Sequence, residues 1–86
     1  MDIIYSSKFA REYKKLPGSI KDIAEGQEKI FRKNPFDPKL KTHKLKGKLN
    51  GFLAFSIGDK YRIIFEFVKD KKTVYFHSAG DHDIYQ

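Results

Sequence analysis

The segment from residue 61 to residue 68, Tyr-Arg-Ile-Ile-Phe-Glu-Phe-Val, constrains the fold more than any other part of the chain. In a β-strand, successive side chains point to opposite faces of the sheet. One face of this strand then carries only apolar and aromatic residues: Tyr61, Ile63, Phe65 and Phe67. The other face is mixed and carries Arg62, Ile64 and Glu66. The apolar face must be covered by another layer, and we expect the mixed face to stay open, with Arg62 pointing out of it.

Two helical segments precede this strand. The first is predicted to begin at a cap formed by Ser6 or Ser7 and to end at Pro17-Gly18, because proline interrupts a helix. The second, longer helix is predicted to be capped by Ser19 and to stop at Asn34-Pro35, since a residue that precedes proline is pushed out of the helical region. Together they form a helical hairpin.

Three further segments have strand composition and are bounded by turn-like residues: residues 2–5, 52–57 and 73–79. The predicted order is β-α-α-β-β-β. We therefore expect an α+β fold in which the helical hairpin packs on one face of a small, mainly antiparallel sheet. With 86 residues, the chain is expected to form a single domain over residues 1–86.

The segment from residue 34 to residue 51 fits neither helical nor strand periodicity, and we expect an ordered loop whose leucines pack on the core. Its central part, residues 39–48, holds five lysines and no acid. It therefore carries most of the formal net charge of +7. Such an excess favours an anionic partner, which from charge alone is a nucleic acid, a membrane surface or an acidic protein segment.

Several classes of site have no support in the sequence. The chain has no cysteine, so neither a disulfide nor a thiolate metal site is expected. It shows no phosphate-binding glycine loop, no zinc-binding histidine pair and no apolar run that would cross a bilayer. We expect no cofactor, no metal, no membrane partner and no signal peptide, which suits a cytoplasmic protein.

Four residues that remain suit metal-free cleavage of RNA: His43, Arg62, His82 and Tyr85. In that reaction a base accepts the proton of the attacking 2′-hydroxyl, an acid protonates the leaving oxygen, and cations stabilise the phosphorane. Each residue also has a plainer interpretation. Arg62 can instead pair with Glu66, His43 can be a surface residue, and Tyr85 can anchor the tail in the core. From the residues alone, the prediction stops at a basic α+β domain that binds an anion.

Three stretches, taken in this order along the chain, resemble the RelE/ParE toxin superfamily of bacterial toxin–antitoxin modules. They are residues 7–17, residues 43–52, and residues 61–65 together with the closing residues 80–85. The resemblance implies a toxin that cuts mRNA on the ribosome and is held inactive by a cognate antitoxin. That antitoxin is expected to present an acidic, amphipathic segment to the basic surface.

The resemblance also implies roles for individual residues. Arg62 would stabilise the transition state, His82 would donate or accept a proton, His43 matches a loop histidine of some members, and Tyr85 matches a closing aromatic residue. The residues expected to bind RNA are four lysines: Lys41, Lys44, Lys46 and Lys48.

The catalytic pattern mixes two subtypes of the superfamily. Ser56 stands where histidine-bearing members have a second histidine, and Lys60 stands where they tend to have an acid. Two alternatives therefore stay open. One is a ParE-like inhibitor of gyrase without catalysis, and the other is a degenerate, non-toxic module that binds nucleic acid or an antitoxin.

Overall fold

The computed structural model describes residues 1–68 and 72–81. The described helices and strands are β1 (Asp2–Tyr5), α1 (Ser7–Lys14), α2 (Gly18–Lys33), β2 (His43–Lys44), β3 (Leu53–Ile57), β4 (Tyr61–Phe67) and β5 (Thr73–Gly80). Two short 3₁₀ turns flank β2: η1 (Pro38–Leu40) and η2 (Gly47–Leu49). The predicted α+β class and the order of its main elements are confirmed.

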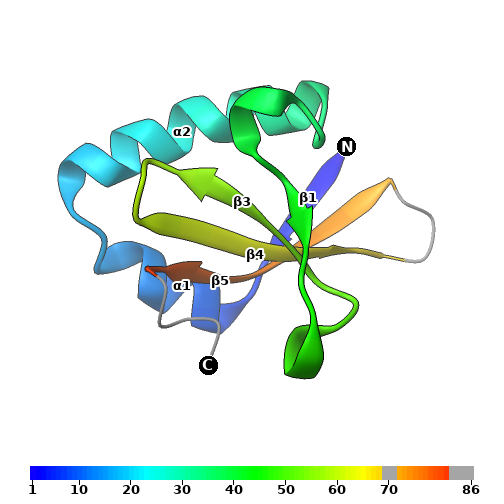
Figure 1. Ribbon diagram of the computed structural model, residues 1–86. Helices are drawn as coiled ribbons and strands as arrows, with labels where there is room; N and C mark the ends of the chain where they lie inside the picture. The colour runs from blue at the N-terminus through cyan, green and yellow to red at the C-terminus, as the bar shows by residue number, and fades with distance from the viewer. Residues whose placement is uncertain (69–71, 82–86) are drawn as a thin grey trace.

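The strands form one twisted sheet in the order β1-β5-β4-β3-β2 (Figure 1). Strands β2, β3, β4 and β5 pair antiparallel, whereas β1 pairs parallel with β5. The ladder between β4 and β5 contains a register shift at Ile64/Phe65, so that β5 has an extra residue at this point. The sheet is therefore mainly antiparallel, as predicted, with one parallel edge strand.

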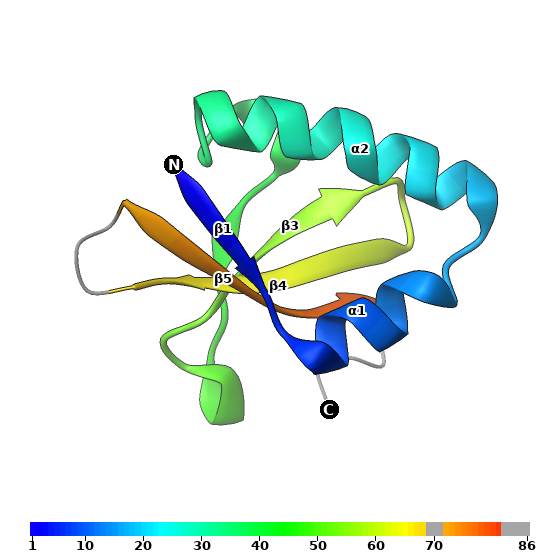
Figure 2. The ribbon, with the colours of Figure 1, turned by 180° about the vertical axis from the view of Figure 1, so that it is seen from behind.

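The two helices cover one face of this sheet, with α1 packed along β5 and α2 over β3 (Figures 1 and 2). The apolar face of β4 lies beneath them, as its alternation predicts. Ile63 and Phe65 are buried there, and Tyr61 and Phe67 pack partly buried against the same core. At the centre, the ring of Phe31 from α2 lies 4.9 Å from those of both Phe55 and Phe65. This aromatic core fixes the helical layer to the sheet.

The start of each helix can be compared with its predicted cap. Ser6 is the N-cap of α1, because its Oγ accepts a hydrogen bond of 2.9 Å from the backbone N–H of Phe9. The prediction that Ser19 caps α2 is wrong. The N-cap of α2 is Pro17, whose carbonyl oxygen accepts from Ile20 and Lys21, so Ser19 already lies inside the first turn.

The segment from residue 34 to residue 51 is ordered, but the prediction of a loop without a strand is wrong. His43 and Lys44 pair with Ala54 and Leu53 and form the edge strand β2. A strand of two residues is too short to show an alternating pattern in the sequence, which explains why it was not predicted. Leu40 is fully buried, as expected for a leucine that anchors this segment to the core.

Candidate functional site

The face of the sheet turned away from the helices is the candidate site. Strand alternation places Arg62, Ile64 and Glu66 of β4 on this face, since Ile63 and Phe65 belong to the core on the other side. The expectation that the face is open needs a correction at its centre. There Ile64 is 0% exposed, and its cross-strand neighbours Ala54 and Ser78 are also buried. The centre of this face is therefore not accessible to solvent, and the partly exposed polar side chains of Arg62 and Glu66 lie on either side of it.

Arg62 lies half-buried at one end of this face, next to the turn between β3 and β4. Its Nη1 donates hydrogen bonds to the carbonyl oxygens of Tyr61, at 2.8 Å, and of Asp59, at 3.2 Å. In the described part of the chain, no ion pair joins Arg62 to Glu66. One nitrogen of the guanidinium is thus anchored to backbone carbonyls, and the fixed fork suits two-point recognition of a phosphate.

His43 lies on the edge strand β2 and faces the same side of the sheet as Arg62. It pairs with Ala54, which pairs with Ile64, two residues from Arg62 along β4. Two strand spacings and two residues of rise put the Cα atoms of His43 and Arg62 about 12 Å apart. Both side chains are long enough to reach one nucleotide placed between them.

Among the described residues, the exposed ring of His43 has one hydrogen bond. Its Nδ1 lies 3.1 Å from the carbonyl oxygen of Lys41, and because a carbonyl can only accept, this nitrogen carries the proton. In the neutral ring, Nε2 is then the nitrogen that can accept a proton. Lys41 supports this contact through its left-handed backbone conformation, with φ of 54°, at the end of η1.

The lysines predicted to bind RNA follow the β2 edge of the sheet. Lys41, Lys44, Lys46 and Lys48 are all exposed. Lys44 pairs with Leu53, which belongs to the core, so its side chain leaves the edge on the helical side and not beside Arg62. The structure therefore places these lysines along an edge that borders the candidate face.

His82 and Tyr85 lie outside the described residues. The last described strand, β5, ends at Gly80, which pairs with Arg62. In the sequence, His82 follows Gly80 by two residues.

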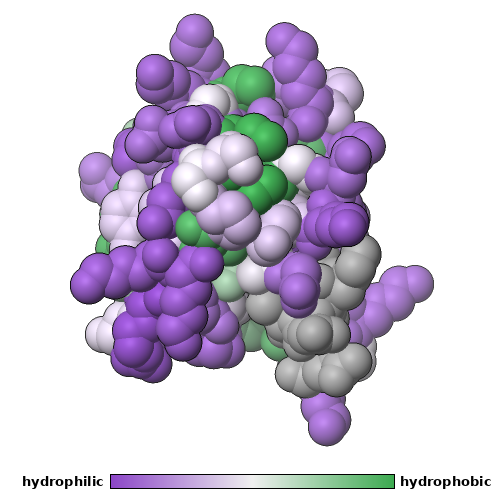
Figure 3. All heavy atoms as spheres, turned by 90° about the vertical axis from the view of Figure 1, so that its left-hand side faces the viewer, coloured by the Kyte–Doolittle hydropathy of each residue, from purple (hydrophilic) through white to green (hydrophobic). Residues whose placement is uncertain are grey.

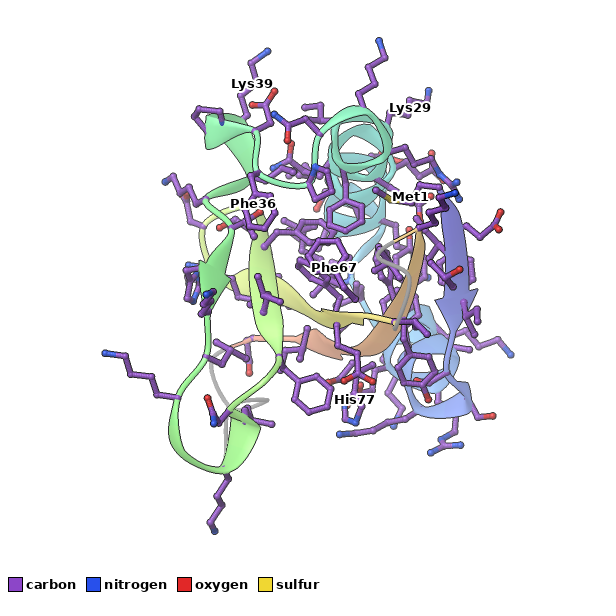
Figure 4. The ribbon with its side chains drawn as sticks, turned by 90° about the vertical axis from the view of Figure 1, so that its right-hand side faces the viewer. Met1, Lys29, Phe36, Lys39, Phe67 and His77 are labelled. Carbon is purple, nitrogen blue, oxygen red and sulfur yellow. The ribbon has the colours of Figure 1, made fainter. Side chains whose placement is uncertain are left out.

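A cluster around His77 on the same face was not predicted as functional. The Nδ1 of His77 lies 3.0 Å from the Oγ of Ser78, and the ring meets those of Phe52 and Tyr75, with centroids 5.0 and 6.3 Å away. Figure 4 shows His77 on the side of the sheet away from α2. The β4–β5 register shift brings His77 and Ser78 to this face together. No sequence signal predicts the shift.

A hollow with a volume of about 650 Å³ lies on the helical side, between α1 and α2. Its aromatic wall is a stack in which Phe9 lies 5.5 Å from Tyr5 and 5.6 Å from Tyr13. Burial raises the pKa of Tyr5, and the 2.6 Å hydrogen bond that its hydroxyl donates to Glu28 raises it further. Burial, with the negative charge of Glu25, also raises the pKa of Tyr13. These tyrosines lie on the other side of the sheet from Arg62.

Residues 1–68 and 72–81 contain neither a cluster of metal ligands nor a membrane-spanning helix. No three His, Asp or Glu side chains gather there as a metal site requires. No described helix has both the length and the apolar character needed to span a membrane.

Comparison with known proteins finds similarity in structure only. No protein-family model matches the sequence, and no curated protein sequence matches it either. Among solved structures, the chain is similar to the YoeB/ParE toxin from Agrobacterium tumefaciens. The TM-score is 0.80 and the identity 14%, and the match covers 95% of this chain and 99% of that one.

Two other solved structures share the fold over similar lengths. YafQ from E. coli matches with a TM-score of 0.75 and 19% identity, over 96% of this chain and 94% of that one. A chain of the RelBE2 toxin–antitoxin complex from Mycobacterium tuberculosis matches with a TM-score of 0.74 and 17% identity, over 94% of this chain and 96% of that one. The chain therefore has the RelE/ParE toxin fold that the resemblance in its sequence predicts.

Proposed function

We propose that the chain is the toxin of a bacterial type II toxin–antitoxin module and that it cleaves mRNA on the ribosome without a metal ion. The observation that carries the proposal is the placement of Arg62, which is anchored by backbone carbonyls at one end of the face turned away from the helices, on the same side of the sheet as His43 on the edge strand. The likeness to solved toxins over nearly the whole chain supports it.

In the proposed reaction the 2′-hydroxyl of the RNA attacks the adjacent phosphate, and the bond to the 5′-oxygen breaks. Arg62 binds the phosphate oxygens as their negative charge grows in the transition state. His43 offers its unprotonated Nε2 as a proton acceptor, and His82 is the second group proposed to exchange a proton. Tyr85 is proposed to contact a base.

The exposed lysines of the β2 edge take a different role in this proposal. Lys41, Lys44, Lys46 and Lys48 bind backbone phosphates and so position the RNA without reading its sequence. Their contribution should be sensitive to salt, because each phosphate contact releases counterions.

The partner proposed for this toxin is an antitoxin with an acidic, amphipathic segment. Solved relatives of the fold include the YoeB–YefM complex from Staphylococcus aureus and the DinJ–YafQ complex from E. coli. A formal charge of +7 on this chain favours a partner of opposite sign.

The proposal is tested by expressing the chain in E. coli and mapping the 5′ ends of transcripts. We expect growth arrest with cuts inside translated codons. Arg62→Ala should lower the cleavage rate by about 10²- to 10³-fold, the usual cost of losing one transition-state donor. Arg11→Ala, which removes an arginine from the helical side, should leave cleavage unchanged.

Intact transcripts in arrested cells would refute the ribonuclease proposal. If covalent gyrase–DNA complexes accumulated in those cells, a gyrase inhibitor with the same fold would be the better interpretation. Normal growth with salt-dependent RNA binding would indicate a degenerate module.

A further inference from the structure

Phe36, which follows α2 and precedes η1, is an exposed aromatic residue held in a defined position. It is 56% exposed, and its ring stacks on that of Phe67 with a centroid distance of 6.0 Å and an interplanar angle of 30° (Figure 4). Phe67 in turn meets the core ring of Phe65 at 5.6 Å. One face of Phe36 is thus packed against a residue tied to the core, while more than half of the side chain remains accessible.

The backbone around Phe36 is also fixed. Its N–H donates a 3.0 Å hydrogen bond to Oδ1 of Asn34, and the hydroxyl of Thr42 donates to the carbonyl oxygen of Pro35. The ring therefore loses little conformational freedom when a flat partner stacks on it, which makes it a preorganised surface.

Several cationic residues lie close to Phe36 in the sequence. Residues 29–41 hold four lysines, Lys29, Lys33, Lys39 and Lys41, against a single acid, Asp37. Arg32 lies in the same stretch, but its guanidinium is turned toward β1, where it donates to the carbonyl oxygen of Met1 and to the hydroxyl of Tyr5. The carboxylate of Asp37 is engaged, because its Oδ1 accepts a 2.9 Å hydrogen bond from the N–H of Lys39. In Figure 4, Lys29 and Lys39 extend from the top of the molecule, and Phe36 and Phe67 lie below them.

The basic segment continues from this end along the sheet edge. After η1 the chain passes Lys41 and enters β2, where His43 faces the candidate site and Lys44 faces the helical side. An extended anionic chain that begins at Phe36 and follows this edge reaches His43, and beyond it the face of the sheet that carries Arg62.

We propose that Phe36 is a stacking platform for one base of a single-stranded RNA whose backbone then follows the β2 edge toward His43. An accessible aromatic face beside clustered cations matches the two recurring needs of single-stranded nucleic acid binding, base stacking and phosphate neutralisation. The inference rests on RNA being the partner in the proposed function. It adds a binding contact away from the reacting phosphate and needs no cleavage.

The test uses a fluorescein-labelled 12-nucleotide RNA with 2′-O-methyl ribose, which can bind but lacks the attacking hydroxyl. Binding is measured by fluorescence anisotropy with the full chain. Phe36→Leu, which keeps apolar contact with Phe67 but removes the flat ring, should weaken binding about tenfold. Phe36→Tyr should bind within about twofold of the unchanged protein, because it retains the ring.

Ile23→Ala supplies the matched control, since Ile23 is another exposed apolar residue, 42% accessible. It lines a shallow hollow with Ile20, Gly58 and Tyr61. Figure 3 shows the left-hand end of the molecule in Figure 1, where apolar surface is confined to small areas among hydrophilic side chains. Binding of the RNA should be unchanged in this variant, and circular dichroism checks that each variant is folded.

Two results would overturn the inference: no binding of the RNA by the unchanged protein, or equal binding by folded Phe36→Leu. If Phe36→Leu instead lost only the binding of an acidic glutamate–tyrosine copolymer, the platform would be a protein-docking site and the RNA inference would fail. Cleavage is assayed separately with unmodified mRNA on translating ribosomes. Its absence, together with a tenfold effect of Phe36→Leu, would refute the ribonuclease and leave the stacking platform standing.

Discussion

Replacement of Phe31 by alanine tests whether the aromatic centre of the core holds the two layers together. Phe31 is the residue of α2 that is 0% exposed, and its ring lies within 4.9 to 5.4 Å of those of Phe55, Phe65 and Phe76. Truncation of such a residue removes its apolar contacts and leaves a cavity between α2 and the sheet. The cost of this kind of change is about 3 to 5 kcal/mol of unfolding free energy.

This cost is large for a chain of 86 residues. At roughly 0.05 to 0.15 kcal/mol per residue, such a domain has only about 4 to 13 kcal/mol of stability in total. For a domain of this size, each kcal/mol moves the melting temperature by about 4 to 8 °C, so we expect a fall of about 12 to 40 °C. The loss should be measured by thermal and urea unfolding, followed by far-ultraviolet circular dichroism.

Phe36→Ala is the matched control, because Phe36 is the same residue type but 56% exposed. It should cost no more than about 1 kcal/mol, as surface substitutions usually do. The reasoning would be refuted if Phe31→Ala lost less than 1 kcal/mol, or if the two variants were destabilised equally.

Four other changes have expected outcomes. Ser6→Ala should lower the free energy of unfolding by about 1 to 2 kcal/mol in urea, because the Oγ of Ser6 both caps α1 and donates to the carbonyl oxygen of His77. Ser7→Ala is the control and should lower it less. Gly58→Ala should cost about 1 to 2 kcal/mol by the same measurement, since Gly58 has a φ of +78° in the turn that precedes Arg62, while the added methyl group meets no hard clash. The folded state raises the pKa of Tyr5, so this tyrosine stabilises the fold below about pH 10 and loses the effect as the pH rises through the raised pKa. Tyr5→Phe should therefore flatten the fall in melting temperature at alkaline pH. An unchanged dependence of melting temperature on pH would count against the raised pKa. Arg62→Lys should retain RNA binding but still reduce cleavage at least tenfold, because an ammonium lacks the two-point fork, and full activity in a transcript-cleavage assay would contradict this role.

The main layers could be predicted from the sequence because their signals are local. The alternation in β4 separates Ile63 and Phe65 from Arg62, and Pro17 and Pro35 mark the limits of α2 to within a residue or two. These features depend on the geometry of neighbouring residues, which the sequence records directly.

The remaining features depend on pairing between distant segments. The parallel contact of β1 with β5, the two-residue strand that contains His43, and the register shift that places His77 beside Ser78 have no local pattern. The sequence also could not show that Ile64 is fully buried on the face expected to be open. Arg62 was predicted to face away from the helices, but its anchoring by the carbonyls of Tyr61 and Asp59 is a result of turn geometry.

The parallel pairing of β1 with β5 has a consequence for how the chain is made. Strand β1 is synthesised first, but its neighbour in the sheet, Thr73–Gly80, is synthesised some 70 residues later. During translation, β1 and the apolar side of α1 therefore lack their partner strand. The sheet can be completed only when β5 has been synthesised. The strand that carries Arg62 also gains its neighbour β5 at this late step. The complete sheet therefore cannot form before β5 has been synthesised, and any activity that needs the complete sheet begins only then.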